Sequence, residues 1–198
     1  MKVLKAFQGK AYQVLGKDFY HFLSHSKNYV TASLFASGLG IISVPIFTRL
    51  LVPADYGILA ILSSFISIFS IIYGLGVRSS VVRYYFEDND DFDKYLGSTL
   101  SLLFIWIAVL TLILIVLKNL LFRFFQVPIG IIYVGIATVI FQAMFTLYQS
   151  YLQAIKKSKK IAFLTVIQKI AGILIGVILI LQMQQDKFYG RAFATLAV

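Results

Sequence analysis

Long runs of apolar residues constrain this chain more than any other feature, and the first run sets the pattern. Between Tyr29 and Val52 the only charged residue is Arg49. A helix of that length crosses the hydrocarbon core of a bilayer, which is about 30 Å thick, because a helix rises ~1.5 Å per residue. The Val52-Pro53 pair then interrupts it, since proline lacks a backbone donor and disfavours helical geometry in the residue before it. Asp55 follows as the predicted cap of a second helix.

The composition indicates a membrane protein. Hydrophobic residues make up 60% of the 198 residues and charged residues only 13%, whereas soluble domains are about 45–50% apolar and ~25% charged. The chain has no cysteine, which excludes disulfides, thiolate nucleophiles and thiolate metal sites. The predicted fold class is therefore an all-α integral membrane protein.

The same helix-and-turn unit recurs along the chain and predicts its organisation. Residues 1–27 form a basic segment whose apolar residues follow the helical period, so we expect a cytoplasmic or interfacial amphipathic helix, or else a tail that marks the cytoplasmic side. Residues 28–198 form the predicted transmembrane lobe. Its helices are expected at about 28–51, 55–86, 95–117, 127–154, 161–183 and 188–198. The sixth has 11 residues, fewer than the roughly 20 that span a bilayer, so we interpret it as truncated and the lobe as the N-terminal part of a longer transporter.

Lysine and arginine are distributed unequally between the two ends of the predicted bundle. The N-terminal segment carries five, and the connections after the second and fourth helices carry three and four. The connections on the opposite side carry five in total, and Lys169 lies within the fifth helix. The positive-inside rule therefore places the N-terminus in the cytoplasm.

Polar side chains recur along one face of the fourth predicted helix. They are Thr138, Gln142, Thr146, Gln149 and Gln153, at steps of three or four residues. Such a face is not expected against lipid. It either bonds to a neighbouring helix, at about 0.6 kcal/mol per hydrogen bond, or lines a hydrophilic cavity, and the sequence leaves both open.

Glycine and proline mark several predicted structural positions. Gly172 and Gly176 form a small-xxx-small pair on the fifth helix, which favours close packing on a neighbouring helix. Pro45 is expected to bend the first helix near its far end, and the segment 74–76 is expected to loosen the second helix.

The sequence offers no catalytic or metal-binding constellation. His21 and His25 lie one turn apart, but no residue nearby completes a metal site. The acidic run 87–93 lacks the glycine and the final glutamate of a calcium loop, so it predicts a solvated turn. We therefore predict no enzymatic activity, no metal and no cofactor.

The segment from Ser37 to Asp88 resembles the start of the Wzx-type polysaccharide and O-antigen flippases. These belong to the multidrug/oligosaccharidyl-lipid/polysaccharide exporter group. The residues that carry the resemblance are Arg49-Leu50-Leu51, Pro53, Tyr56-Gly57 and the stretch 74–83. It covers about residues 28–198, which would be one of two pseudo-symmetric lobes.

The resemblance implies transport of an oligosaccharide linked to polyprenyl pyrophosphate across the bacterial inner membrane. Transport would run from the cytoplasmic to the outer leaflet, by alternating access around a cationic cavity. The implied partners are the lipid-linked oligosaccharide, membrane lipids, a polysaccharide polymerase and glycosyltransferases. No nucleic-acid partner is expected.

Three arginines are candidate phosphate ligands, because a forked guanidinium matches phosphate oxygens. Arg49 lies in the last turn of the first helix, where it could instead reach the interface or bond to Asp55. Arg78 and Arg83 lie at the predicted cytoplasmic mouth, where they could instead serve as positive-inside anchors. The candidate sugar ligands are Gln142, Thr146 and Gln149, with Ser63, Ser67 and Ser70 of the second helix.

Two other functions stay open at this point. A drug exporter of the same group would be favoured by an aromatic-lined cavity with a buried carboxylate, but all eight acidic residues lie outside the predicted helix cores. A non-transporting membrane scaffold would be complete at this length, and the unfinished sixth helix argues against it.

Overall fold

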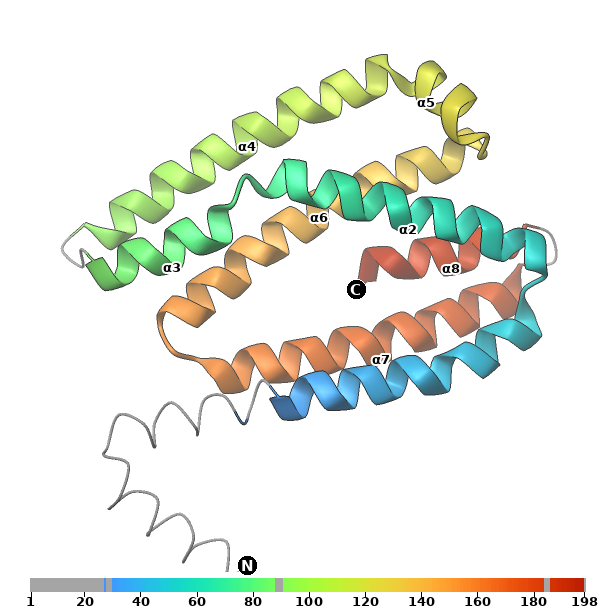
Figure 1. Ribbon diagram of the computed structural model, residues 1–198, viewed down its shortest axis with the longest axis horizontal. Helices are drawn as coiled ribbons and strands as arrows, with labels where there is room; N and C mark the ends of the chain where they lie inside the picture. Colours follow the sequence, from blue (N-terminus) through green and yellow to red (C-terminus); the bar gives the residue numbers. More distant parts are fainter. Residues whose placement is uncertain (1–26, 28–29, 88–90, 184–185, 198) are drawn as a thin grey trace, which may run out of the picture.

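The computed structural model describes residues 27, 30–87, 91–183 and 186–197, which form helices that run back and forth along one axis (Figure 1). The helices are the first helix (Val30–Leu50), α2 (Pro53–Gly74), α3 (Val77–Glu87), α4 (Phe92–Val116), α5 (Lys118–Phe125), α6 (Ile129–Ala154), α7 (Ser158–Gln182) and α8 (Phe188–Ala194). A 3-10 turn, Thr195–Ala197, follows α8. The described residues contain no strand.

Five segments are long and apolar enough to cross a bilayer, which confirms the all-α membrane class. They are the first helix, the Pro53–Glu87 segment that α2 and α3 form, α4, α6 and α7. The α3–α4 and α6–α7 connections lie at one end of the bundle, and α5 and the α7–α8 connection lie at the other (Figure 1). This alternation is what consecutive spans require. Which end faces the cytoplasm stays a prediction from the charges.

The turn after the first helix forms slightly earlier than predicted. The first helix continues through Pro45 to Leu50, and α2 begins at Pro53 rather than Asp55. Asp55 is therefore the third residue of α2 and not its cap. Its carboxylate accepts a hydrogen bond from the backbone N–H of Val52, at 3.2 Å, and this bond closes the turn.

The second predicted helix, 55–86, is two helices with a break between them. Leu75 and Gly76 have φ angles of 45° and 67°, in the left-handed region that glycine adopts at no steric cost. The expected loosening at 74–76 is thus confirmed as a full interruption. The break separates the apolar α2 from α3, which buries Val77 and Val81 and exposes its arginines.

Two hydrogen bonds from α4 hold the α2 side of this break. Trp106 donates through Nε1 to the carbonyl of Ile72, at 2.9 Å, and the hydroxyls of Tyr73 and Thr111 are 3.1 Å apart. In a continuous helix the Ile72 carbonyl would accept from the N–H of Gly76. Trp106 therefore satisfies a carbonyl that the break releases inside the membrane.

Replacing Trp106 by phenylalanine should lower the thermal stability. The substitution keeps an aromatic ring but leaves the Ile72 carbonyl without its indole donor, which costs about 1 kcal/mol. For a chain of this size we expect the melting temperature to fall by about 2–4 °C, as measured by the fraction of protein that stays monodisperse in detergent after heating. Phe104→Leu is the control, because that ring is 58% exposed. Equal melting temperatures for Trp106→Phe and wild type would show that the hydrogen bond from Trp106 to the Ile72 carbonyl does not stabilise the break.

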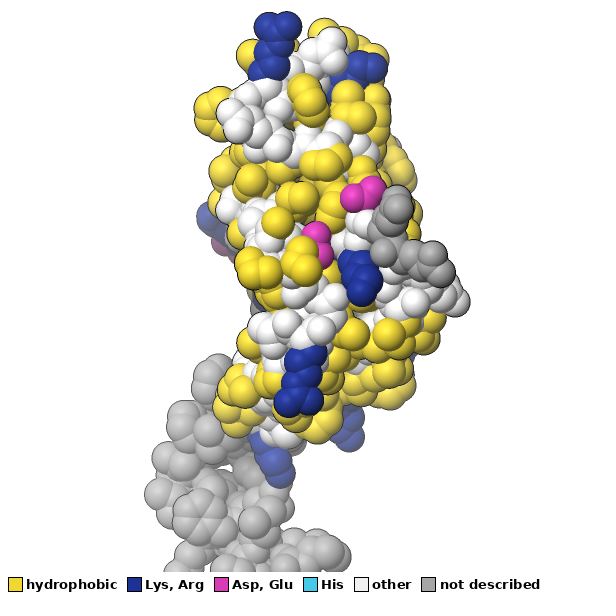
Figure 2. All heavy atoms as spheres, turned by 90° about the vertical axis from the view of Figure 1, so that its right-hand side faces the viewer, with side chains coloured by type: hydrophobic (Ala, Val, Ile, Leu, Met, Phe, Trp, Pro, Cys, Tyr) yellow, Lys and Arg dark blue, Asp and Glu magenta, His cyan; other side chains and the backbone are white. Residues whose placement is uncertain are grey.

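The helix α5 was not predicted. Its outward side chains include Leu120 and Phe124, which are 62% and 78% exposed, while the ring of Phe125 lies edge-on to Phe65 of α2, with centroids 5.9 Å apart. Figure 2 views this end of the molecule and shows hydrophobic side chains over most of it, with basic side chains at separate points. The segment is thus an amphipathic helix at the end of the bundle rather than a simple exit from the third span.

The helix α6 is the centre of the described bundle. In its most apolar stretch of 18 residues, 44% of the residues are buried inside the bundle, against 17% for the corresponding stretch of each of the other four spans. A Cβ on Gly135 would lie 2.8 Å from the ring of Phe65, so α2 and α6 approach closely there. The faces of α6 that remain free are therefore few, and one of them borders the cavity described next.

Candidate functional site

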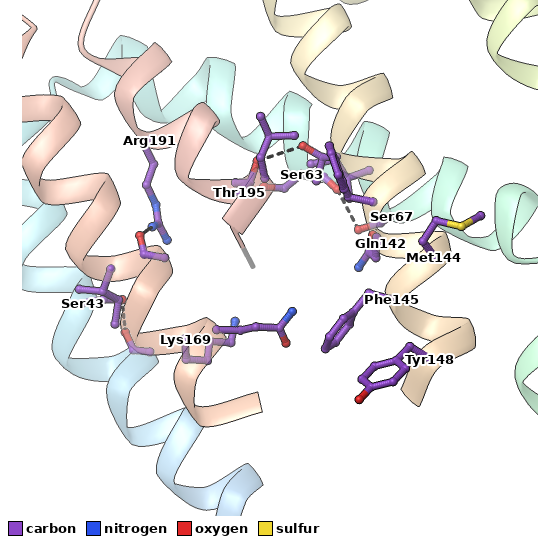
Figure 3. Close-up of a pocket in the computed structure, with 18 residues that line it drawn as sticks. Ser43, Ser63, Ser67, Gln142, Met144, Phe145, Tyr148, Lys169, Arg191 and Thr195 are labelled. Atoms are coloured by element: carbon purple, nitrogen blue, oxygen red, sulfur yellow. Dashed lines mark hydrogen bonds between the residues drawn. The ribbon is translucent and has the colours of Figure 1, made fainter. Parts of the chain in front are cut away.

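A cavity of about 780 Å³ opens between the first helix, α2, α6, α7 and the segment from α8 into the following turn (Figure 3). Its size is within the range of small-molecule sites. Its polar lining consists of Ser43, Ser63, Ser67, Thr138, Gln142, Tyr148, Gln168, Lys169, Arg191 and Thr195. Among the described residues that line it, none is acidic.

The serine and threonine hydroxyl groups of the lining already donate hydrogen bonds to helix backbones. Ser43 donates to the carbonyl of Gly40 at 2.7 Å, and Ser63 donates to that of Leu59 at 2.8 Å. Ser67 and Thr138 make the same kind of bond within their own helices, each at 2.8 Å. These side chains can therefore accept hydrogen bonds from a ligand, but their single donors are in use.

Arg191 is held in place on one side of the cavity. Its Nη1 donates to the carbonyl of Gly172 on α7, at 3.2 Å, and its guanidinium carbon lies 4.0 Å from the centroid of the Phe47 ring. A Cβ on Gly176 would lie 3.2 Å from the same Nη1, so the absence of a side chain there makes room for the guanidinium. Arginine has five N–H donors, and the fixed geometry leaves the others for a ligand.

Lys169 is the second cation of the cavity. It lies near the middle of α7, one turn before Gly172, and has no ion pair or hydrogen bond with any other described residue. A lysine at the bilayer centre costs about 2.5–3.5 kcal/mol, so its ammonium must face water or an anion. The turn between Lys169 and Gly172 thus brings two positive charges to one face of α7.

The opposite wall belongs to α6. Gln142, Phe145 and Tyr148 point from α6 into the cavity, toward the side on which Lys169 lies (Figure 3). Gln142 and Tyr148 make no hydrogen bond to another described residue, and neither does Gln168 of α7. The cavity therefore has a cationic side and an aromatic, amide-bearing side, each with unused hydrogen-bonding groups.

The predicted polar stripe of α6 divides at this cavity. Thr138 and Gln142 line it, whereas Thr146, Gln149 and Gln153 are half-buried outside it. The face of α6 that lines the cavity continues from Gln142 to Phe145 and Tyr148, so the later polar residues of the stripe lie on another face. Of the three predicted sugar ligands on α6, the structure brings only Gln142 to the cavity.

The three predicted phosphate ligands lie outside the cavity. Arg49, Arg78 and Arg83 are exposed. Arg83 pairs with Glu87 one turn away, at 2.8 Å. The other ion pair among the described residues joins Lys94 with Asp91, so Arg49 does not pair with Asp55.

The remaining sequence predictions concern the serines of α2, the glycines of α7 and the N-terminal segment. Ser63 and Ser67 line the cavity and Ser70 does not. Gly172 and Gly176 are buried, the first as the acceptor for Arg191. The segment 1–26, with His21 and His25, lies outside the described residues, and the described residues contain no cluster that could hold a metal ion.

The sequence reasoning missed both cavity cations as candidate ligands. For Lys169 the signal was present, because it is the only charge within the predicted helix 161–183, and such a residue marks a functional site by default. For Arg191 the signal was absent. Its position near the start of the sixth helix gave it the appearance of an interfacial charge, and only the packing of α8 against α7 carries it to the cavity.

The comparisons with known proteins point to polysaccharide biosynthesis. Residues 27–197 match the family model described as "Polysaccharide biosynthesis protein". No curated protein and no solved structure matches the chain significantly. The matched range includes all five spans and every residue that lines the cavity.

Proposed function

The chain belongs to the polysaccharide biosynthesis protein family, and from this premise we propose that it forms part of a flippase for a lipid-linked oligosaccharide. The substrate would carry a polyprenyl pyrophosphate and cross the bacterial inner membrane from the cytoplasmic to the outer leaflet. Glycosyltransferases would build this substrate, and a polymerase would use it after it has crossed. The members of this family are transporters rather than enzymes.

The observation that carries the proposal is the pair of cations in a membrane cavity. Arg191 and Lys169 line it together, and the described lining residues include no acidic side chain that would offset their charge. A pyrophosphate would neutralise both, because guanidinium and ammonium groups form charge-assisted hydrogen bonds with phosphate oxygens. The preset guanidinium, fixed by Gly172 and Phe47, reduces the entropy lost when the ligand binds.

The rest of the cavity fits the other parts of such a substrate. The hydroxyls and amides supply partners for sugar hydroxyls. Exposed apolar side chains on the neighbouring helices, such as Phe141 on α6 and Leu174 on α7, are suited to contact a lipid tail.

A drug exporter is the competing function, and one feature favours it. The cavity has aromatic side chains at Phe141, Phe145 and Tyr148. The buried carboxylate that would attract a cationic drug is not among the described lining residues. Two cations would repel such a drug, so the charges favour an anionic substrate.

Deletion of the gene should abolish the cell-surface polysaccharide that depends on it. The lipid-linked precursor should then accumulate in the cytoplasmic leaflet, because its synthesis continues while its transfer stops. Radiolabelled precursor would be extracted from right-side-out and inverted vesicles after treatment with a glycosidase that does not cross membranes. We expect digestion only in inverted vesicles, and restoration of surface polysaccharide by the full-length gene. Digestion in right-side-out vesicles, or an unchanged surface polysaccharide, would overturn the proposal.

A further inference from the structure

The unused hydrogen-bonding groups of the cavity are not distributed evenly. On the side of α2 and the first helix, the hydroxyls donate to their own backbones. On α6, Gln142 and Tyr148 keep all their donors and acceptors, and both point into the cavity (Figure 3). The uncharged lining side chains that keep free donors are therefore Gln142 and Tyr148 on α6 and Gln168 on α7.

The same face of α6 presents aromatic rings. Phe145 and Tyr148 lie one turn apart and line the cavity on the side opposite Lys169 (Figure 3). Neither ring contacts another aromatic ring among the described residues, whereas Phe65 and Phe125, which pack in the core, do. Tyr148 is 45% exposed, so its ring face is accessible to a ligand.

An aromatic face with amide and phenol groups beside it is suited to a sugar ring. The C–H face of a pyranose is apolar and stacks on an aromatic ring, while its equatorial hydroxyls lie at the ring edge and need hydrogen-bond partners. Gln142 offers two donors and an acceptor, and the phenol of Tyr148 offers one donor. The serines and threonines of the cavity offer acceptors only.

We propose that Phe145, Tyr148 and Gln142 of α6 form a subsite for the first sugar of the substrate, the one bonded to the pyrophosphate. The inference rests on the proposed function, since it takes the pyrophosphate to lie at Arg191 and Lys169. The first sugar is the one that the covalent linkage keeps nearest to those cations. The α6 wall across the cavity therefore selects by the first sugar rather than by the distal part of the glycan.

The test compares two soluble probes on the full-length protein in nanodiscs. One is farnesyl diphosphate, and the other is the same lipid with one N-acetylglucosamine on its terminal phosphate. Native mass spectrometry gives the two dissociation constants and hence the preference for the sugar. The variant is the double substitution Phe145→Leu with Tyr148→Leu, which removes both rings but keeps apolar side chains. The matched control is Phe163→Leu on α7, whose ring is 65% exposed and does not line the cavity.

We expect wild type and Phe163→Leu to bind the glycosylated probe about tenfold more tightly than the bare one. The double variant should bind both probes equally, with an unchanged affinity for farnesyl diphosphate that also shows its folding is intact. Equal affinities in wild type, or a preference that survives in the double variant, would overturn the subsite while binding of both probes still supports the proposed function. Binding of neither probe to wild type would overturn both.

Discussion

Lys169→Gln and Arg191→Gln should each reduce export of the polysaccharide by about 10- to 100-fold, the loss that follows from removing ~1.5–3 kcal/mol of charged hydrogen bonding. Both side chains line the cavity, and the described lining residues include no acidic side chain that would balance them. Removal of either leaves one cation to bind a dianionic group. Export is measured as surface polysaccharide per cell in a strain that lacks the gene and expresses each full-length variant in equal amount.

Conservative variants separate charge from geometry at these two positions. Lys169→Arg keeps a charge on a flexible stem and should restore most of the export. Arg191→Lys should restore less. An ammonium is too small to donate to the Gly172 carbonyl, stack on Phe47 and donate two parallel hydrogen bonds to phosphate at the same time. Full export with Arg191→Lys would show that the fixed guanidinium is not required.

Two further variants complete the comparison. Lys118→Gln on α5 removes a basic charge that does not line the cavity, and it should leave export unchanged. Arg49→Gln tests one of the three candidate phosphate ligands from the sequence. Because Arg49 is exposed and does not line the cavity, we expect a smaller loss than with Lys169→Gln. A larger loss with Arg49→Gln would return the phosphate to the end of the first helix.

The spans were predictable because bilayer thickness sets the length of an apolar run. The first helix was expected at 28–51 and is found at Val30–Leu50, and the fourth was expected at 127–154 and is found at Ile129–Ala154. The helix α5 was not predictable in this way. Its eight residues are too few to show a period, and it contacts α2 through the ring of Phe125, which lies against Phe65.

The cavity could be predicted only in part for a related reason. A polar stripe on α6 indicates that one face avoids lipid, but it does not show how far along the helix a cavity extends. Gln142 lies within the cavity, and Gln149, two turns further, lies beyond it. The position of Arg191 depends on contacts between α7 and α8, which no local pattern reveals. Among the glycines at this contact, one allows the closest approach of the two helices.

That residue is Gly190, and replacing it with alanine should destabilise the protein by about 1–3 kcal/mol. A Cβ there would lie 2.8 Å from the backbone nitrogen of Ile180 and 2.9 Å from the carbonyl carbon of Leu179. Both atoms belong to the α7 backbone, so no side chain can rotate away to make room. The added methyl must therefore push α8 off α7.

Gly97→Ala on α4 is the matched control, because a Cβ there has no atom within 4 Å. It should be neutral or stabilising by up to about 1 kcal/mol, since alanine favours a helix interior over glycine. Thermal unfolding in detergent and export in cells are measured for both variants. Movement of α8 would carry Arg191 away from Gly172 and Phe47, so Gly190→Ala should lose export in proportion to stability. If Gly190→Ala were as stable as Gly97→Ala, the helices would be further apart than described, and the position of the Arg191 guanidinium in the cavity would lose its basis.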